Sequence, residues 1–275
     1  MRDQSQPPVY SVPAVDRALR ILRILAVSND GLSLAELSSQ LASPKSSVHS
    51  ILATLARHRF VERDGDGRWT LGLSTFEVGS AYAARMDLVA AFRAVATRLA
   101  AECGQTIQLA VLDGREVVYV AKVDGTEPVR LVSHEGARLP AHTTALGKAL
   151  LAHLTPQCFE DLYGGRVLTA LTPYSIVSLG ALRSELDRVR EQGFAYDNEE
   201  TALGLHCVAS SICDRDGQAV AAISISMPSH RMSQARFEDL KERVRQAAAD
   251  ISSRLGCRLP HGVPDGAVVL AKVGQ

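Results

Sequence analysis

The feature that most constrains this chain is a pair of short amphipathic segments, separated by a proline and followed by a polar hairpin, within residues 33–71. The first segment opens on Ser33, with Glu36 three residues later. This spacing predicts a capping box, in which each side chain bonds the backbone N–H of the other residue. Leucines then recur at helical spacing, at Leu34, Leu37 and Leu41. Pro44 ends this helix and is expected at the first position of the next one, where proline loses no needed hydrogen bond.

The second segment divides into an apolar face and a polar face. Four apolar residues recur at helical spacing and are expected to pack inward: Val48, Ile51, Leu52 and Leu55. The opposite face carries short polar and cationic side chains, namely Lys45, Ser46, Ser47, His49, Ser50, Thr54 and Arg57. Such side chains can reach base edges and phosphates without bulk. The segment is therefore predicted to lie in the major groove of DNA.

A hairpin is predicted directly after these two helices. Two alternating runs flank the turn sequence Asp-Gly-Asp-Gly at residues 64–67, a strong hairpin signal. Arg68 at its edge suits a phosphate or minor-groove contact, and Ser33 is a further predicted DNA contact. Helix, turn, helix and wing in this order are a device for DNA binding. The alternative is a small helical bundle with a solvated polar face, which the order of the signals disfavours.

Composition limits the classes to which the chain can belong. Its 275 residues, 46% of them hydrophobic, fit one large domain or two ordinary ones with a real core. The formal net charge is zero, so the total charge does not indicate nucleic-acid binding. A local basic face is sufficient for a small DNA-binding domain. Part of this face is expected from the first helix, at Arg17, Arg20 and Arg23.

The cysteines and the polarity of the chain indicate a reducing compartment. The five cysteines are odd in number and have no short paired spacing, which argues against a disulfide framework or a zinc finger. The sequence has no apolar run of the roughly 18 residues that a membrane span needs. Residues 1–11 are polar, contain proline and lack a signal-peptide core, so we expect a disordered lead-in. These features favour a cytoplasmic protein without membrane contact.

The periodicity predicts two domains joined by a helix. Residues 12–78 form the DNA-binding domain, braced by a helix over 15–26 with Val15, Ala18, Leu19, Leu22 and Leu25 on one face. An alanine-rich segment over 74–101 is expected to be one long helix, with residues 79–101 as the linker. The domain boundary is predicted near 79–86. A second domain over 102–260 and a frayed tail over 261–275 follow.

The second domain alternates between strand and helix patterns. Strands are predicted over residues 106–112, 116–123, 128–133, 194–197, 207–213 and 219–226, several of them flanking Asp-Gly turns. Helices are predicted over residues 144–154, 179–192 and 234–255. Strands, then helices, then strands and a helix predict an α+β domain with an antiparallel sheet.

The chain resembles the IclR-type transcriptional regulators. The resemblance rests on the segment 44–49 and on the motif His-Thr-Thr-Ala-Leu-Gly-Lys-Ala-Leu-Leu-Ala at 142–152, and it covers about residues 12–258. It implies an N-terminal winged helix-turn-helix and a C-terminal effector-binding domain of GAF-like shape. It also implies dimers, often paired into tetramers, on operator DNA. Ser50 stands where many relatives carry arginine, so the operator sequence does not follow from the resemblance.

The resemblance and the chemistry of the motif together predict an effector pocket. The motif reads as a loop that runs into a helix, and the first turn of a helix can hold a carboxylate with its free N–H groups. Ser224 and Ser226 face one side of a strand. The ligand-binding residues implied are Leu131, Leu139, Ala145, Leu146, Gly147, Asp197, Leu205, Cys207, Ser224 and Ser226. Without the resemblance, each pattern also has a structural explanation. The start of the helix can be plain packing, the two serines can lie on a solvated strand face, and Cys207 can be a small buried thiol.

Two rival chemistries have less support in the sequence. A metal site would need His142, His206, Cys207 and Cys213 to meet, and no pair has the short spacing of a structural zinc site. Cys207 as a nucleophile has no activating motif around it. We therefore expect no metal, no cofactor and no catalysis. The prediction is a ligand-responsive regulator, repressor or activator, of metabolic genes that senses a small organic acid. The alternative is a small-molecule enzyme with a winged-helix appendage.

Overall fold

The structure, a computed structural model, describes residues 12–28, 30–84, 87–126 and 134–257. The chain divides into two compact units, residues 1–85 and residues 86–275, here called the N-terminal and the C-terminal unit. Three predicted features fall outside the described residues: the lead-in over 1–11, the strand over 128–133 and the tail over 261–275. Each unit is described by itself below.

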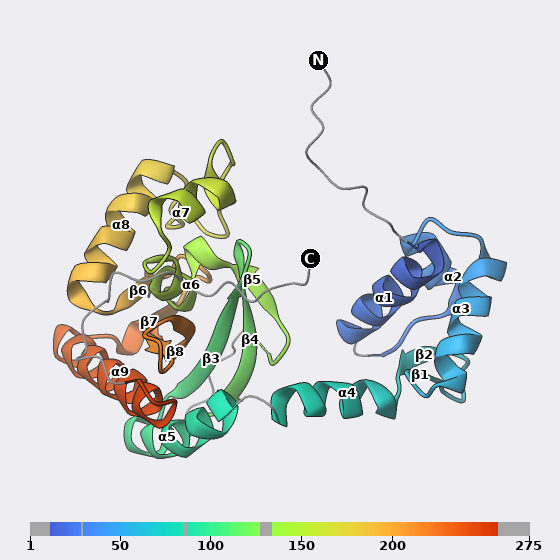
Figure 1. The fold of residues 1–275 in the computed structure, drawn as a ribbon, viewed down its shortest axis with the longest axis horizontal. Helices are drawn as coiled ribbons and strands as arrows, with labels where there is room; N and C mark the ends of the chain where they lie inside the picture. Colours follow the sequence, from blue (N-terminus) through green and yellow to red (C-terminus); the bar gives the residue numbers. More distant parts are fainter. Residues whose placement is uncertain (1–11, 29, 85–86, 127–133, 258–275) are drawn as a thin grey trace. The chain divides into compact units, whose positions relative to one another are not determined.

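The N-terminal unit contains the predicted helix, turn, helix and hairpin (Figure 1). Its elements are α1 Pro13–Ala26, α2 Leu34–Gln40, α3 Lys45–Arg57, β1 Val61–Arg63, β2 Trp69–Leu71 and α4 Leu73–Ala84. The capping box of Ser33 and Glu36 is present at the start of α2, as predicted. Pro44 directly precedes α3 and is not its first residue, because its ψ of 140° is extended.

The core of the N-terminal unit confirms the apolar faces of α2 and α3 and corrects that of α1. Val48 and Leu52 are buried, and Ile51 and Leu55 pack against the same core. In α1, by contrast, the buried residues are Ile21 and Leu25. The predicted face was wrong at Val15 and Leu19, which are both 54% exposed. Apolar side chains occur around much of this helix, so the sequence pattern alone does not single out the face that contacts α3.

The C-terminal unit is built on a six-stranded antiparallel sheet in the order β5-β4-β3-β8-β7-β6. The strands are β3 Thr106–Asp113, β4 Glu116–Val123, β5 Arg138–Pro140, β6 Ala195–Asn198, β7 Leu205–Cys213 and β8 Ala219–Pro228. Five of them match predicted strands. The short edge strand β5 was not predicted; it pairs with the start of β4. The α+β class and the antiparallel sheet are confirmed.

Helices cover both faces of this sheet (Figure 1). α5 Asp87–Cys103 and α9 Gln234–Arg254 pack on one face, and α6 Ala145–Leu151, α7 Pro156–Tyr163 and α8 Leu179–Gln192 pack on the other. Two short 3₁₀ turns complete the unit, η1 Ala141–Thr143 and η2 Ser229–Arg231. α7 was not predicted from the sequence, although the cap Thr155 followed by a proline marks its start. None of the described helices is long and apolar enough to cross a membrane.

The segment 74–101, predicted as one helix, contains two. α4 ends at Ala84 and α5 begins at Asp87, on either side of two residues that are not described. α5 buries Phe92, Val95 and Leu99 in the core it shares with α9. Most of the predicted linker is therefore a structural part of the C-terminal unit. Alanine-rich periodicity continues through both helices, so it does not mark the end of the first.

Candidate functional site

The exposed face of α3 carries the polar side chains that were predicted to contact DNA. Six of the seven are solvent-exposed: Lys45, Ser46, His49, Ser50, Thr54 and Arg57. The hydroxyls of Ser50 and Thr54 donate to the carbonyls four residues earlier, at 3.0 Å each. Their oxygens can still accept from a partner outside the helix. α3 therefore presents two cations, a histidine and several hydroxyls to solvent.

Three other predicted DNA contacts have partners inside the unit. The Ser47 hydroxyl is half-buried and accepts from Nη1 of Arg17 at 2.5 Å. Arg68 donates from Nη2 to the Gly31 carbonyl at 2.9 Å and forms an ion pair with Glu36. The Ser33 hydroxyl caps α2. Arg68 and Ser33 thus fasten the wing and the first helix of the motif, whereas Ser47 holds Arg17 beside α3.

A pocket in the C-terminal unit brings together most of the predicted ligand-binding residues. It lies between the sheet, the start of α6 and the loop after β6. The predicted residues that line it are Leu139, Ala145, Leu146, Asp197, Leu205, Cys207 and Ser224. Five further lining residues were missed: Gln108, Tyr119, Thr144, Thr201 and Ala202. A polar Gln108 inside the apolar run 106–112 was the signal that could have found the first of them.

The two predicted serines have different roles in the sheet. Ser224 is 1% exposed, lines the pocket and has a buried hydroxyl with no hydrogen-bond partner among the described residues. Ser226 lies two residues further along β8, and its hydroxyl donates to Oε1 of Gln108 at 3.3 Å. It does not line the pocket, so the prediction of direct ligand contact is not supported for Ser226. A buried hydroxyl without a partner costs free energy, which singles out Ser224 as a group available to a ligand.

Gly147 is another predicted ligand contact that the structure places outside the pocket lining. The Gly147 amide donates to the Thr144 hydroxyl at 2.9 Å, which caps α6. A Cβ at Gly147 would lie 2.1 Å from the carbonyl oxygen of Ala141. The absence of a side chain at Gly147 therefore lets the backbone of Ala141 approach closely. Gly147 does not line the pocket. Leu131 lies outside the described residues.

Asp197 and Cys207 are paired across β6 and β7 and both line the pocket. Oδ1 of Asp197 accepts from the amides of Glu200 at 2.7 Å and Thr201 at 3.3 Å. Burial raises the pKa of Asp197, which is 2% exposed. Burial also raises the pKa of the Cys207 thiol, so this cysteine is not the thiolate that nucleophilic catalysis requires.

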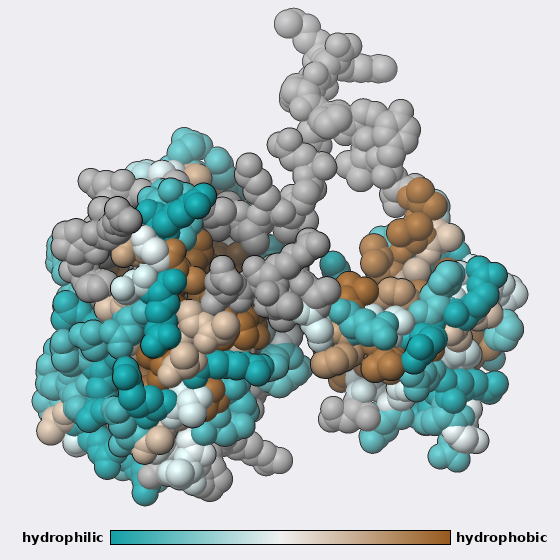
Figure 2. Space-filling view, turned by 60° about the horizontal axis from the view of Figure 1, so that its bottom comes forward, coloured by the Kyte–Doolittle hydropathy of each residue, from teal (hydrophilic) through white to brown (hydrophobic). Residues whose placement is uncertain are grey.

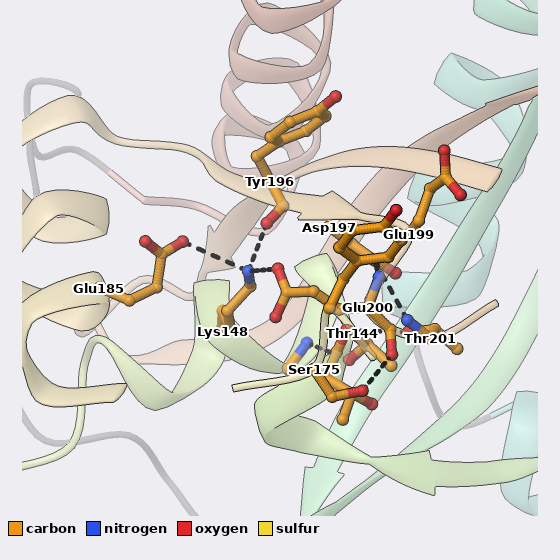
Figure 3. Close-up of polar contacts among 12 residues, drawn as sticks. Thr144, Lys148, Ser175, Glu185, Tyr196, Asp197, Glu199, Glu200 and Thr201 are labelled. Atoms are coloured by element: carbon orange, nitrogen blue, oxygen red, sulfur yellow. Dashed lines mark hydrogen bonds and ion pairs between the residues drawn. The ribbon is translucent and has the colours of Figure 1, made fainter. Parts of the chain in front are cut away.

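Figure 3 shows a buried ion cluster, centred on Lys148, that was not predicted from the sequence. Lys148, 1% exposed, extends from α6 and contacts Oε1 of Glu200 at 2.5 Å and Oε1 of Glu185 at 3.3 Å. Its ammonium also donates to the Tyr196 carbonyl, next to Asp197 in the chain. Burial raises the pKa of Glu200 although Lys148 opposes this effect. One ammonium thus joins α6, α8, β6 and the loop after β6.

The side chains considered as metal ligands do not form a cluster. Nε2 of His142 lies 3.1 Å from the Thr169 carbonyl, and the Sγ of Cys207 lies 3.3 Å from the Ser226 hydroxyl. Within the described ranges, no three His, Cys, Asp or Glu side chains come together to hold a metal ion.

Comparison with known proteins identifies the family. Residues 80–253 match the model described as the bacterial transcriptional regulator IclR C-terminal domain, and residues 14–65 match the IclR helix-turn-helix domain. The chain belongs to the IclR family. It is 39% identical over 262 residues to the HTH-type transcriptional repressor AllR of Salmonella typhi, covering 94% of this chain and 95% of AllR. The IclR relatives are transcriptional regulators and not enzymes, so the alternative of an enzyme with a winged-helix appendage is wrong.

Solved IclR structures share the fold over most of the chain. The Thermotoga maritima IclR structure has a TM-score of 0.74 at 28% identity, covering 89% of this chain and 99% of that one. An IclR homolog from Microbacterium hydrocarbonoxydans, solved with 4-hydroxybenzoate, has a TM-score of 0.80 at 24% identity and covers 88% of this chain and 98% of that one. The winged helix-turn-helix and the antiparallel domain therefore match IclR architecture, and a GAF-like shape is consistent with it.

Proposed function

We propose that this IclR regulator controls metabolic genes and that its C-terminal pocket senses a small organic acid. The observation that carries the proposal is the pocket itself, where the unpartnered hydroxyl of Ser224 and the buried carboxyl of Asp197 line one small space. Buried polar groups are normally satisfied, so such groups in a pocket are suited to a polar ligand. AllR, named as a repressor, supports a repressor more than an activator.

Operator recognition is assigned to the exposed face of α3. His49, Ser46 and Ser50 are short enough for base edges, whereas Lys45 and Arg57 suit phosphates. Two copies would insert α3 into successive major grooves, roughly one helical turn or a multiple of it apart. The sequence of each operator half-site would then be read by those α3 side chains that contact base edges.

An acid is favoured by the groups around the pocket. Ala145 and Leu146 belong to the first turn of α6, where backbone amides have no helical carbonyl within reach. Together with Ser224 they provide donors, and Leu139 and Leu205 provide an apolar wall. The Microbacterium homolog binds an aromatic acid, 4-hydroxybenzoate, in its solved complex. These features support a carboxylate ligand over a cation.

A second copy of the chain is the proposed partner in the cytoplasm. Figure 2 shows hydrophobic side chains gathered on part of the surface of the N-terminal unit. Val12, directly before α1, is 63% exposed, Val15 and Leu19 on α1 are each 54% exposed, and Phe76 on α4 is 70% exposed. Exposed apolar groups of this size favour a protein partner. We propose a homodimer, paired into a dimer of dimers on the operator.

One combined assay tests this proposal. The full-length protein is mixed with its own promoter region in a gel-shift assay, with and without acetate, lactate, succinate or 4-hydroxybenzoate. We expect a shifted band that one of these acids alters, and a matching rise in thermal stability. The variant Ser224→Ala should keep the shift and lose the response to acid. A shift that no acid alters in either protein would contradict acid sensing.

A further inference from the structure

Asp197 has one oxygen committed to the backbone and lies in the pocket where a ligand would sit. Oδ1 accepts the amides of Glu200 and Thr201, which holds the carboxyl in place at the end of β6. The side chain is 2% exposed and lines the pocket. A ligand that fills the pocket therefore meets this carboxyl with little water between them.

Among the described residues, the surroundings of Asp197 contain more acidic groups than cations. The titratable groups that face it are Lys148 of α6, Glu200 of the following loop, Tyr196 of β6, Cys207 of β7 and, across the pocket, Tyr119 of β4. The ammonium of Lys148 is already bound to Glu200 and Glu185. Among the described residues, no cation contacts Asp197 directly. The ammonium of Lys148 therefore contacts two carboxyls, those of buried Glu200 and half-buried Glu185, and Glu185 also pairs with Arg188.

A second anion in this space would be repelled by an ionised Asp197. Two carboxylates that share a site of low dielectric hold one proton between them, because both cannot stay charged at close range. Burial already raises the pKa of Asp197 before any ligand is present. The proton is thus more easily held at this position than at an ordinary aspartate.

We propose that the pocket binds a carboxylate together with one proton, which Asp197 takes up from solvent and donates to the bound carboxylate as a hydrogen bond. This inference rests on the proposed function and adds its chemistry: one proton enters for each anion, and no other bond is made or broken. Affinity should then weaken as pH rises above the pKa of Asp197 in the free protein, by up to about tenfold per pH unit. A neutral amide ligand of the same size should bind without taking up a proton.

Titration calorimetry of the full-length protein tests the proposal. Succinate is titrated, at a pH where its affinity falls as pH rises, in Hepes and in Tris, whose ionisation enthalpies differ, and each of acetate, lactate and 4-hydroxybenzoate is treated in the same way. For the acids that bind, the buffer dependence should give an uptake of about one proton per site. Asp197→Asn should reduce the uptake to zero and make affinity independent of pH. Glu199→Gln, a matched neutralisation at the neighbouring Glu199 that pairs with His206, should retain the uptake.

The outcomes separate this inference from the proposed function. An acid that binds without proton uptake, or uptake that persists in Asp197→Asn, overturns the inference and leaves acid sensing in place. Equal uptake with succinamide would overturn it too, because that ligand brings no negative charge. Failure of all four acids to bind overturns acid sensing, and the inference falls with it.

Discussion

In α3, only Val48 and Leu52 of its 13 residues are fully buried, whereas all seven residues of α6 are buried. α3 presents side chains to solvent, so its chemistry can change with little effect on the core. α6 offers the backbone of its first turn to the pocket and uses its side chains for packing and for the ion pair of Lys148. The two helices therefore predict opposite responses to substitution: altered binding in α3 and altered stability in α6.

The largest effect is expected from Lys148→Met, which leaves the Glu200 carboxylate buried without its cation. Removing one partner of a buried ion pair costs about 3–5 kcal/mol of unfolding free energy. Urea unfolding followed by far-UV circular dichroism measures it. The double variant with Glu200→Gln should recover part of the loss, since position 200 then carries no buried charge. If Lys148→Met alone were as stable as the wild type, the expectation that substitutions in α6 alter stability would be contradicted.

Lys148→Met should also change how the free energy of unfolding depends on pH, and the sign of this change follows from the pKa of Glu200. Burial raises the pKa of Glu200 above 4.5, its value in the unfolded chain, so the folded state binds this proton more tightly. Stability from this group is complete below the unfolded pKa and is lost as pH rises through the folded pKa. Without Lys148 the folded pKa rises further, so unfolding free energy should fall more steeply towards neutral pH than in the wild type. Equal slopes would mean that Lys148 does not neutralise Glu200.

The next effect is expected from Gly147→Ala, because its Cβ would overlap the carbonyl of Ala141. Backbone cannot move aside as a flexible side chain does, so we expect a loss of about 3 kcal/mol in the C-terminal unit. Gly79→Ala is the matched control, since nothing lies within 4 Å of its added Cβ. Fluorescence of Trp69, the one tryptophan of the chain, reports the N-terminal unit and should be unaffected in both variants.

In α3, His49→Ala should weaken operator binding by about 1–3 kcal/mol while changing stability by less than about 0.5 kcal/mol. The reason is that His49 is exposed and supports no core contact. The matched control is His58→Ala, at the exposed C-terminal end of the same helix. Fluorescence anisotropy with labelled promoter DNA measures both. Equal losses for the two histidines would argue against the predicted reading face.

In the C-terminal unit, the smallest change in stability is expected from Ser224→Ala, within about 1 kcal/mol, because the removed hydroxyl has no partner among the described residues. Ser226→Ala should cost more, since it breaks the hydrogen bond to Gln108. Thermal unfolding with and without succinate or 4-hydroxybenzoate compares the two. Retention of the acid response in Ser224→Ala would show that the pocket binds its ligand through other groups.

Local signals made the N-terminal unit largely predictable from its sequence. The capping box at Ser33, the proline break and the Asp-Gly turns act over three or four residues, so they can be recognised without tertiary contacts. The order of strands and helices in the C-terminal unit followed from periodicity in the same way. α1 was misjudged because the burial of Ile21 depends on its neighbours in space. β5 was missed because three residues at a sheet edge have too little pattern.

The sequence alone determined the two-part organisation through local periodicity, and its resemblance to the IclR-type regulators implied the family and most of the pocket residues. The tertiary structure decided which groups are available. It showed that Ser224 is unpartnered while Ser226 bonds Gln108, and that Gly147 accommodates Ala141. It also brought Lys148 to Glu185 and Glu200, residues 37 and 52 positions away. Burial and charge balance arise only when distant segments pack, and no spacing along the chain encodes them.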